Sequence, residues 1–293
     1  MGPHLEDTPG HVDPAALAAR VEELAATPAG ESLPTDVEHV VFRVLDALET
    51  GEVRAARRDE HGIWRAVHWV KRGILLAFRA GAVVDMSPPG GILRFFDKRT
   101  IPPRLLTVGH GVRVVPGGSS IRRGAYVAPG VVCMPPMFVN AGAWVGTGTM
   151  IDSHALVGSC AQIGERVHLS AAAQIGGVLE PVNAAPVIIE DDVVVGGNCG
   201  VYEGTVVRAR AVLAAGTVLT RGTPVFDLVN ETVLRGSTES PLEIPAGAVV
   251  VPGARAVTSG WGRDQGLSLQ TPVIVKYRDE RTDLSTALES WLR

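Results

Sequence analysis

An apolar residue recurs at every sixth position through the middle of this chain. From Val115 to Ile175 eleven successive positions in this frame are apolar; the frame then slips by two residues and runs on from Ile189 to Val225. A period of six matches neither the 3.6 of a helix nor the 2 of an open strand, and short hexapeptide repeats are typical of a parallel β-helix. Three hexads make one triangular coil, so these eighteen positions predict about six coils.

The residues between the apolar positions fit the same architecture. Small side chains recur four residues after the apolar ones, and Gly is frequent three residues after them, where a corner needs a left-handed backbone. The alternative is a Gly-rich and Val-rich β-sandwich, which eleven consecutive matches in one frame argue against. We therefore expect a mainly β protein.

The segments outside the repeat are of a different kind. Residues 1–12 are polar and rich in Pro and Gly, and we expect them to be disordered. Residues 13–105 show helical spacing, with Asp13 as an N-cap, and predict a small α-rich N-terminal domain. Residues 106–258 then form the β-helix domain, and residues 259–293 a short C-terminal extension of one strand and one helix.

The slip between Ile175 and Ile189 predicts a loop that leaves the tube. The segment from Ile175 to Ile189 is two residues longer than a whole number of hexads. Insertions in a solenoid project from one face and tend to carry function.

Composition excludes several classes of partner. The formal net charge of −4 gives no reason to expect nucleic acid or an anionic membrane. The three cysteines, Cys133, Cys160 and Cys199, lack metal-ligand spacing and predict neither a metal site nor a disulfide framework. The polar first ten residues resemble neither a signal peptide nor a membrane span, so we expect a cytoplasmic protein.

A tube filled with Val and Ile side chains has no internal cavity, so any site must lie on its outer surface. Flat faces can pair with copies of the same chain, and a three-fold assembly is a compact solution with grooves between tubes. Two functions remain open on the repeat alone: a structural or binding scaffold, and an acyltransferase.

Several runs of residues are more specific than the repeat. Residues 149–152 (Thr-Met-Ile-Asp), 157–164, 167–170 and 175–181 closely resemble the tetrahydrodipicolinate N-succinyltransferase family. The resemblance extends over nearly the whole chain from about residue 34. Further matches lie at residues 69–79, 96–98, 113–116, 139–143, 188–191, 203–204 and 273–276.

This resemblance implies a homotrimer of left-handed β-helices with active sites between subunits. It also implies transfer of succinyl from succinyl-CoA to the amine of L-2-amino-6-oxopimelate, the ring-opened form of tetrahydrodipicolinate, in lysine and diaminopimelate biosynthesis. The expected partners are thus a small amino dicarboxylate and an acyl-CoA co-substrate, with no permanently bound cofactor.

The resemblance also assigns two central site residues. Asp152 follows the inward Ile151 and matches a substrate-contacting aspartate, which would hold the substrate ammonium and accept its proton. Arg113 matches a substrate-binding arginine, suited to grip a carboxylate with two bonds. The alternative for Asp152 is a corner aspartate whose side chain bonds its own backbone, and the alternative for Arg113 is a solvated surface arginine.

Five further residues are candidates for roles in the site. His168 is a possible base, although solenoid histidines are often structural, and Glu203 is a possible second catalytic carboxylate. Ser170 lies eighteen residues after Asp152 and would contact substrate from the same face. Glu180 is a possible substrate-binding carboxylate in the loop, and Lys276 a possible contact for CoA phosphates.

Three features depart from the family pattern. His154 stands where an aromatic residue is expected, residues 171–174 (Ala-Ala-Ala-Gln) replace a Gly-rich run, and Gly200 stands where the family usually has an active-site glutamate. A lost carboxylate suggests a different amine acceptor or acyl donor, with His154 as a compensating base. The alternatives are therefore a divergent relative that acylates another amino acid-like amine, and a scaffold that has lost activity.

Overall fold

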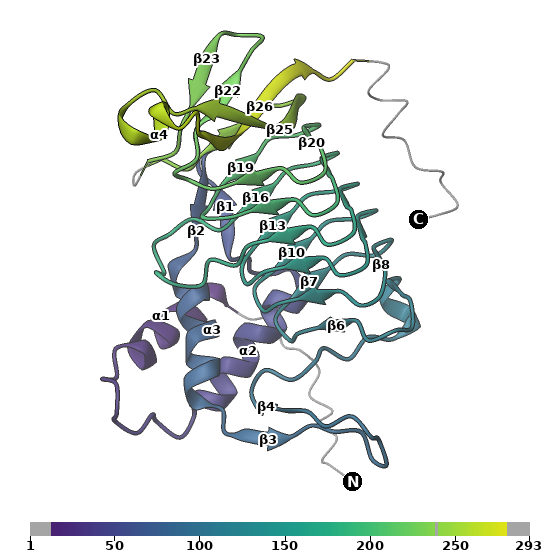
Figure 1. Cartoon of the computed structure of the whole chain (residues 1–293). Helices are drawn as coiled ribbons and strands as arrows, with labels where there is room; N and C mark the ends of the chain where they lie inside the picture. The colour runs from purple at the N-terminus through teal and green to yellow at the C-terminus, as the bar shows by residue number, and fades with distance from the viewer. Residues whose placement is uncertain (1–12, 238–239, 280–293) are drawn as a thin grey trace.

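The sequence repeat forms a triangular tube of short parallel strands, with helices packed beside one end (Figure 1). This computed structural model describes residues 13–237 and 240–279. The prediction of a mainly β protein with a left-handed parallel β-helix and a small helical N-terminal region is confirmed. The predicted disorder of residues 1–12 and the predicted C-terminal helix lie outside the described residues.

Three sheets form the three faces of the tube. On each face, strands of successive coils pair in parallel. The first face contains β5 (Arg113–Val114), β8 (Val132–Cys133), β11 (Met150–Ile151), β14 (His168–Leu169), β17 (Val194–Val195) and β20 (Val212–Leu213). The second contains β6 (Ser120–Ile121), β9 (Phe138–Val139), β12 (Leu156–Val157), β15 (Gln174–Ile175), β18 (Gly200–Val201) and β21 (Val218–Leu219). The third contains β7 (Tyr126–Val127), β10 (Trp144–Val145), β13 (Gln162–Ile163), β16 (Ile188–Ile189), β19 (Val206–Val207) and β24 (Glu243–Ile244).

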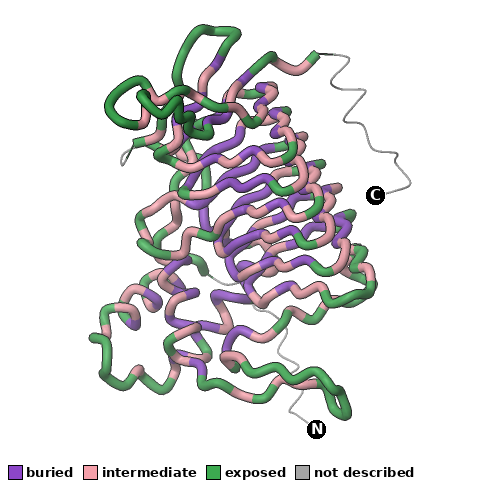
Figure 2. The backbone as a smooth tube through the Cα atoms, in the orientation of Figure 1, coloured by how far each residue is buried: buried purple, intermediate pink, exposed green. Residues whose placement is uncertain are grey.

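The in-frame residues fill the tube, which Figure 2 shows as a buried interior running through the coils. From Ile121 to Val225 each of them is buried. The first predicted position is wrong by one residue, because Val114 and not Val115 pairs with Cys133. The corner that follows contains Gly117 and Gly118, both with positive φ, and takes up the extra residue.

The C-terminal part closes the far end of the tube. The chain leaves after β21, forms a hairpin of β22 (Val225–Asp227) and β23 (Thr232–Leu234), and returns with β24 and β25 (Ala248–Ala256) to complete a last coil. A short helix α4 (Gly260–Asp264) precedes β26 (Ser268–Tyr277), which pairs antiparallel with β25. The strand predicted in the C-terminal extension is β26.

The N-terminal region is a cluster of three helices. These are α1 (Pro14–Ala25), capped by the Asp13 side chain on the Ala15 N–H, α2 (Val37–Thr50), which ends at the left-handed Gly51, and α3 (His68–Ala80). Their shared core extends to Ala141 and Cys160 on a corner of the tube. The remaining elements are β1 (Ala56–Arg58), β2 (Trp64–Ala66), β3 (Val83–Asp85), β4 (Phe96–Lys98) and the 3-10 helix η1 (Val108–His110). No helix among the described residues has the length and apolar character that crossing a bilayer requires.

The predicted loop lies between β15 and β16. Strand pairing joins Trp144 to Gln162 across eighteen residues but Gln162 to Ile188 across 26, so the loop adds eight residues, which are one hexad and the two residues of the slip. The fully buried Lys71 of α3 holds it by donating hydrogen bonds to the carbonyl oxygens of Pro181 (3.1 Å) and Ala184 (2.8 Å). Burial lowers the pKa of this lysine.

Candidate active site

Asp152 and His168 approach each other at the corner between the first and second faces. Each belongs to its own coil, because β11 pairs with β14 and places Met150 beside His168. The Oδ2 atom of Asp152 lies 3.9 Å from Nε2 of His168, and both side chains are partly exposed, at 32% and 18%. The carboxylate is therefore beside an imidazole and still open to solvent, as a group that exchanges protons with a substrate must be.

The backbone role considered for Asp152 is also present. Its Oδ1 atom accepts a hydrogen bond from the Ser153 N–H at 2.8 Å. One carboxylate oxygen thus fixes the side chain on the corner, and the other faces His168. The two roles are compatible, because a positioned carboxylate has its second oxygen available for a ligand.

Ser170 follows one coil after Asp152, as its spacing predicts. The Asp152 N–H donates to the Leu169 carbonyl at 2.9 Å, so the next residue, Ser170, lies directly beside Asp152 along the tube. Its side chain is half-buried. Asp152, His168 and Ser170 therefore form one group, which we call the Asp152 corner.

Arg113 shares the first face with this group but not its coil. The register runs from Arg113 through Val132 to Met150, so two strand spacings separate Arg113 from the Asp152 coil. At about 4.8 Å per strand this is about 10 Å along the tube. Arg113 is exposed, and it lies on the same side of the molecule as Asp152.

Three predicted site residues lie away from the Asp152 corner within one chain. Glu203 is on the corner between the second and third faces, where it accepts a hydrogen bond from the Arg221 N–H of the next coil at 3.1 Å. Glu180 is exposed in the loop on that same corner. Lys276 is exposed on β26 and pairs with Asp279 at 3.2 Å.

His154 and Gly200, the two single residues that depart from the family pattern, lie in different parts of the structure. His154 is exposed at the Asp152 corner with a left-handed φ of 63°, and its N–H donates to the Pro136 carbonyl. Gly200 lies on the second face, where the ring of Tyr202 covers it: a Cβ at Gly200 would meet that ring at 2.5 Å. The space beside Gly200, where the resemblance predicts a glutamate, is therefore occupied by an aromatic side chain.

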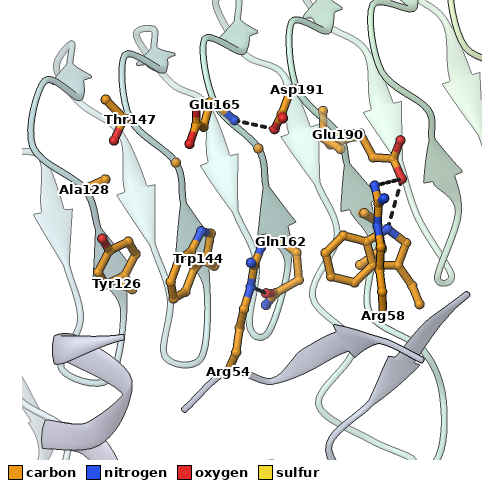
Figure 3. A pocket seen from close by; sticks show the side chains of 15 residues that line it. Arg54, Arg58, Tyr126, Ala128, Trp144, Thr147, Gln162, Glu165, Glu190 and Asp191 are labelled. Atoms are coloured by element: carbon orange, nitrogen blue, oxygen red, sulfur yellow. Dashed lines mark hydrogen bonds and ion pairs between the residues drawn. The ribbon is translucent and has the colours of Figure 1, made fainter. Parts of the chain in front are cut away.

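A further site, absent from the sequence predictions, lies on the third face. A pocket of about 410 Å³ opens between this face and the β1–β2 hairpin (Figure 3). Its lining includes Arg54, Tyr126, Trp144, Gln162 and Asp191. The one signal in the sequence is the eighteen-residue spacing of the outward residues Tyr126, Trp144 and Gln162, which stacks them in one column.

Glu190 lies at the edge of this pocket with its carboxylate fully engaged. It accepts hydrogen bonds from Arg58 (2.8 Å), Trp64 (3.0 Å), Arg208 (2.9 Å) and the Ala209 N–H (3.1 Å). Burial alone would raise its pKa, but the bonds from Trp64 and Arg208 outweigh burial and hold the pKa below the ordinary value. Glu190 therefore joins the β1–β2 hairpin to the tube.

All three cysteines are buried thiols. Burial raises the pKa of Cys133 and of Cys160 to about 12, and it also raises that of Cys199. Such thiols pack as small apolar groups and are poor nucleophiles.

Comparison with known proteins identifies the family. The family description "Tetrahydrodipicolinate N-succinyltransferase N-terminal" matches residues 17–80, and "Hexapeptide repeat of succinyl-transferase" matches residues 186–221. A 2,3,4,5-tetrahydropyridine-2,6-dicarboxylate N-succinyltransferase of Polynucleobacter asymbioticus is 40% identical over 288 residues, which cover 96% of this chain and 98% of that one. Enzymes of the same name from Nitrobacter hamburgensis and Bradyrhizobium diazoefficiens are 43% and 42% identical, over 88% of this chain and 90% of each of theirs.

These matches include both the helical region and the repeat, and the likeness to the Polynucleobacter asymbioticus enzyme runs through nearly the full length of both chains. The repeat and the sequence identity indicate the same family. The chain belongs to the tetrahydrodipicolinate N-succinyltransferase family.

Proposed function

We propose that this protein is a CoA-dependent N-acyltransferase that moves succinyl from succinyl-CoA to the amine of L-2-amino-6-oxopimelate, in lysine and diaminopimelate biosynthesis. The observation that carries the proposal is the Asp152 corner, where a solvent-accessible carboxylate lies 3.9 Å from an imidazole in a chain 40% identical to succinyltransferases. An amine acceptor needs a neighbouring base, since its ammonium form is not a nucleophile.

The reaction at this corner begins with a proton transfer. Asp152, assisted by His168, takes a proton from the substrate ammonium, and the freed amine attacks the thioester carbonyl. The tetrahedral oxyanion is stabilised by backbone N–H groups of a coil corner. Its collapse breaks the C–S bond and releases CoA thiolate, which takes up the extra proton of the attacking nitrogen. The products are the neutral amide and CoA thiol, and the proton on Asp152 passes to solvent.

The remaining predicted residues enter as binding groups in this proposal. Arg113 pairs with a substrate carboxylate, and Ser170 donates a hydrogen bond to substrate. Glu203 and Glu180 lie on a different corner from Asp152, so they contribute only if a second copy brings that corner to the first. We therefore include a homotrimer with sites between subunits, the binding of CoA phosphates by Lys276, and a cytoplasmic location as parts of the proposal.

The deciding experiment measures free thiol release from succinyl-CoA with enzymatically prepared tetrahydrodipicolinate. Release by the wild type that Asp152→Asn abolishes supports the reaction and the role of Asp152. An absence of release from a folded protein that binds CoA contradicts this acceptor. Light scattering tests the assembly separately, with three times the 30.8 kDa chain mass expected.

A different acceptor is the second candidate, because Gly200 has no carboxylate and the Tyr202 ring occupies its place. Under this alternative another amino acid-like amine replaces L-2-amino-6-oxopimelate. Thiol release with a panel of amino dicarboxylates and amino monocarboxylates compares the two acceptors directly. A kcat/KM at least tenfold higher for another amine favours the second candidate.

A further inference from the structure

The pocket on the third face is separate from the Asp152 corner. It contains none of the residues assigned to acyl transfer, and it opens beside the β1–β2 hairpin (Figure 3). Its volume of about 410 Å³ is at the small end of the range for ligand sites, about 300–1,000 Å³. One wall is aromatic: the rings of Tyr126 and Trp144 stack with centroids 3.8 Å apart.

Arg54 brings a positive charge into this pocket, and no carboxylate of the described residues forms an ion pair with it. Its Nε atom donates to the Gln162 amide oxygen at 2.6 Å, and its guanidinium lies 4.1 Å from the Trp144 ring centroid. Among the residues that the structure describes, none accepts a hydrogen bond from its two Nη atoms. Burial lowers the pKa of Arg54 to about 10, which leaves it charged at neutral pH.

Asp191 lies on the side of the pocket away from the hairpin and carries the opposite charge (Figure 3). Its Oδ1 atom accepts a hydrogen bond from the Glu165 N–H at 2.8 Å. Within residues 13–237 and 240–279 it forms no ion pair by contact, although its charge attracts that of Arg54. The neighbouring carboxylates are engaged, Glu165 with Arg166 and Glu190 with Arg58 and Arg208.

The pocket thus offers one cation and one anion that attract each other without an ion-pair contact, and an aromatic wall. A dianion would meet repulsion from Asp191, and a simple cation would meet repulsion from Arg54. A zwitterion satisfies both charges, because a carboxylate matches the paired Nη donors of arginine and an ammonium matches a carboxylate. An apolar or aromatic side chain would pack against the edges of the stacked rings, because Tyr126 covers one face of Trp144 and the Arg54 guanidinium the other.

We propose that this pocket binds a free α-amino acid, with its carboxylate on Arg54, its ammonium on Asp191 and its side chain against Trp144 and Tyr126. The site is distinct from the acceptor site, and its existence does not depend on the proposed acyl transfer.

Isothermal titration of the full chain with each of the twenty proteinogenic amino acids tests the proposal. We expect saturable binding of at least one, and at least tenfold weaker binding of its amide and of its deaminated acid. Arg54→Gln and Asp191→Asn should each weaken binding at least tenfold. Arg57→Gln and Glu52→Gln, exposed neighbours outside the pocket, should leave it unchanged.

Two further variants keep the test decisive. Asp152→Asn separates this site from the acceptor site, since binding should persist in that variant. Arg54→Lys retains the charge without the paired donors, and it should bind weakly while showing wild-type circular dichroism, which excludes misfolding as the cause. The absence of saturable binding by any amino acid at 20 mM, loss of binding in Asp152→Asn, or equal affinity for the deaminated acid would overturn the proposal.

Discussion

Two carboxylates occupy the same place in the hexapeptide repeat and have opposite surroundings. Asp152 and Glu190 each follow an inward isoleucine, Ile151 and Ile189, so each side chain starts on the outer surface of the tube. Glu190 accepts four hydrogen bonds and its side chain is 9% exposed. Asp152 accepts one from the neighbouring backbone, faces an imidazole at 3.9 Å, and is 32% exposed.

The difference comes from what packs against each face. The β1–β2 hairpin covers the third face at Glu190 and supplies Arg58 and Trp64. Within the described parts of the chain, Asp152 forms no hydrogen bond or ion pair with the helices or the hairpin. The same repeat position thus yields a structural junction where it is covered and a candidate catalytic group where it is open.

The largest expected effect is on activity at the open corner. Asp152→Asn keeps the bond from the Ser153 N–H but cannot accept a proton, so kcat/KM for acyl transfer should fall by about 10²–10⁴-fold. Glu190→Gln should leave kcat/KM within the same order of magnitude. Thiol-release kinetics of both folded variants measure the two kcat/KM values. An equal fall in kcat/KM for the two variants would contradict a catalytic role that is specific to Asp152.

The free energy of unfolding should change in the reverse order, with the larger loss in Glu190→Gln and the smaller in Asp152→Asn. Glu190→Gln places an amide among two arginines and a tryptophan N–H, and should lower the free energy of unfolding by about 1–3 kcal/mol. Asp152→Asn should change it by less than about 0.5 kcal/mol. Urea unfolding at one protein concentration measures both. A more stable Glu190→Gln would show that the junction does not hold the hairpin.

Gly200 extends the comparison to an outward position with no carboxylate. Gly200→Ala should cost about 1–3 kcal/mol, because its Cβ would meet the Tyr202 ring at 2.5 Å and force the ring to move. In a Tyr202→Ala background the same substitution should cost much less. A double-mutant cycle of unfolding free energies gives the coupling, and additive costs would mean that the ring is not the obstacle.

The smallest expected effect is a pH dependence at the covered carboxylate. The pKa of Glu190 is lowered from 4.5 in the folded protein, so the folded state binds fewer protons at this site than the unfolded chain. Its stabilisation is complete above pH 4.5 and is lost as the pH falls through the folded pKa. Unfolding free energies should therefore decline more steeply in acid for the wild type than for Glu190→Gln, and parallel curves would refute the link.

Much of the fold follows directly from the chain, because each coil repeats the same local demands. An apolar residue at every sixth position determines the inward column, and residues eighteen apart become neighbours, as Asp152 and Ser170 do. The position of Val115 was wrong because an end coil has a coil on one side only, and its corner accommodated one more residue.

The candidate site was predictable only in part. The repeat and the family resemblance together indicated Asp152, His168 and Ser170, and the structure brings these three side by side. Their roles stay predictions, as do those of Arg113, Glu203, Glu180 and Lys276. The sequence does not predict the pocket of the third face, because Arg54 contacts Gln162 across 108 residues and no local pattern encodes that contact.

The period of six and the outward direction of Asp152 and Glu190 are thus properties of the amino-acid order, since they depend on backbone geometry within one or two coils. Which carboxylate is covered and which stays open is a property of the tertiary structure. It depends on where the hairpin and α3 dock, through contacts such as Arg58 with Glu190 and Lys71 with the loop carbonyls. These contacts join residues more than a hundred positions apart, and only the folded chain brings them together.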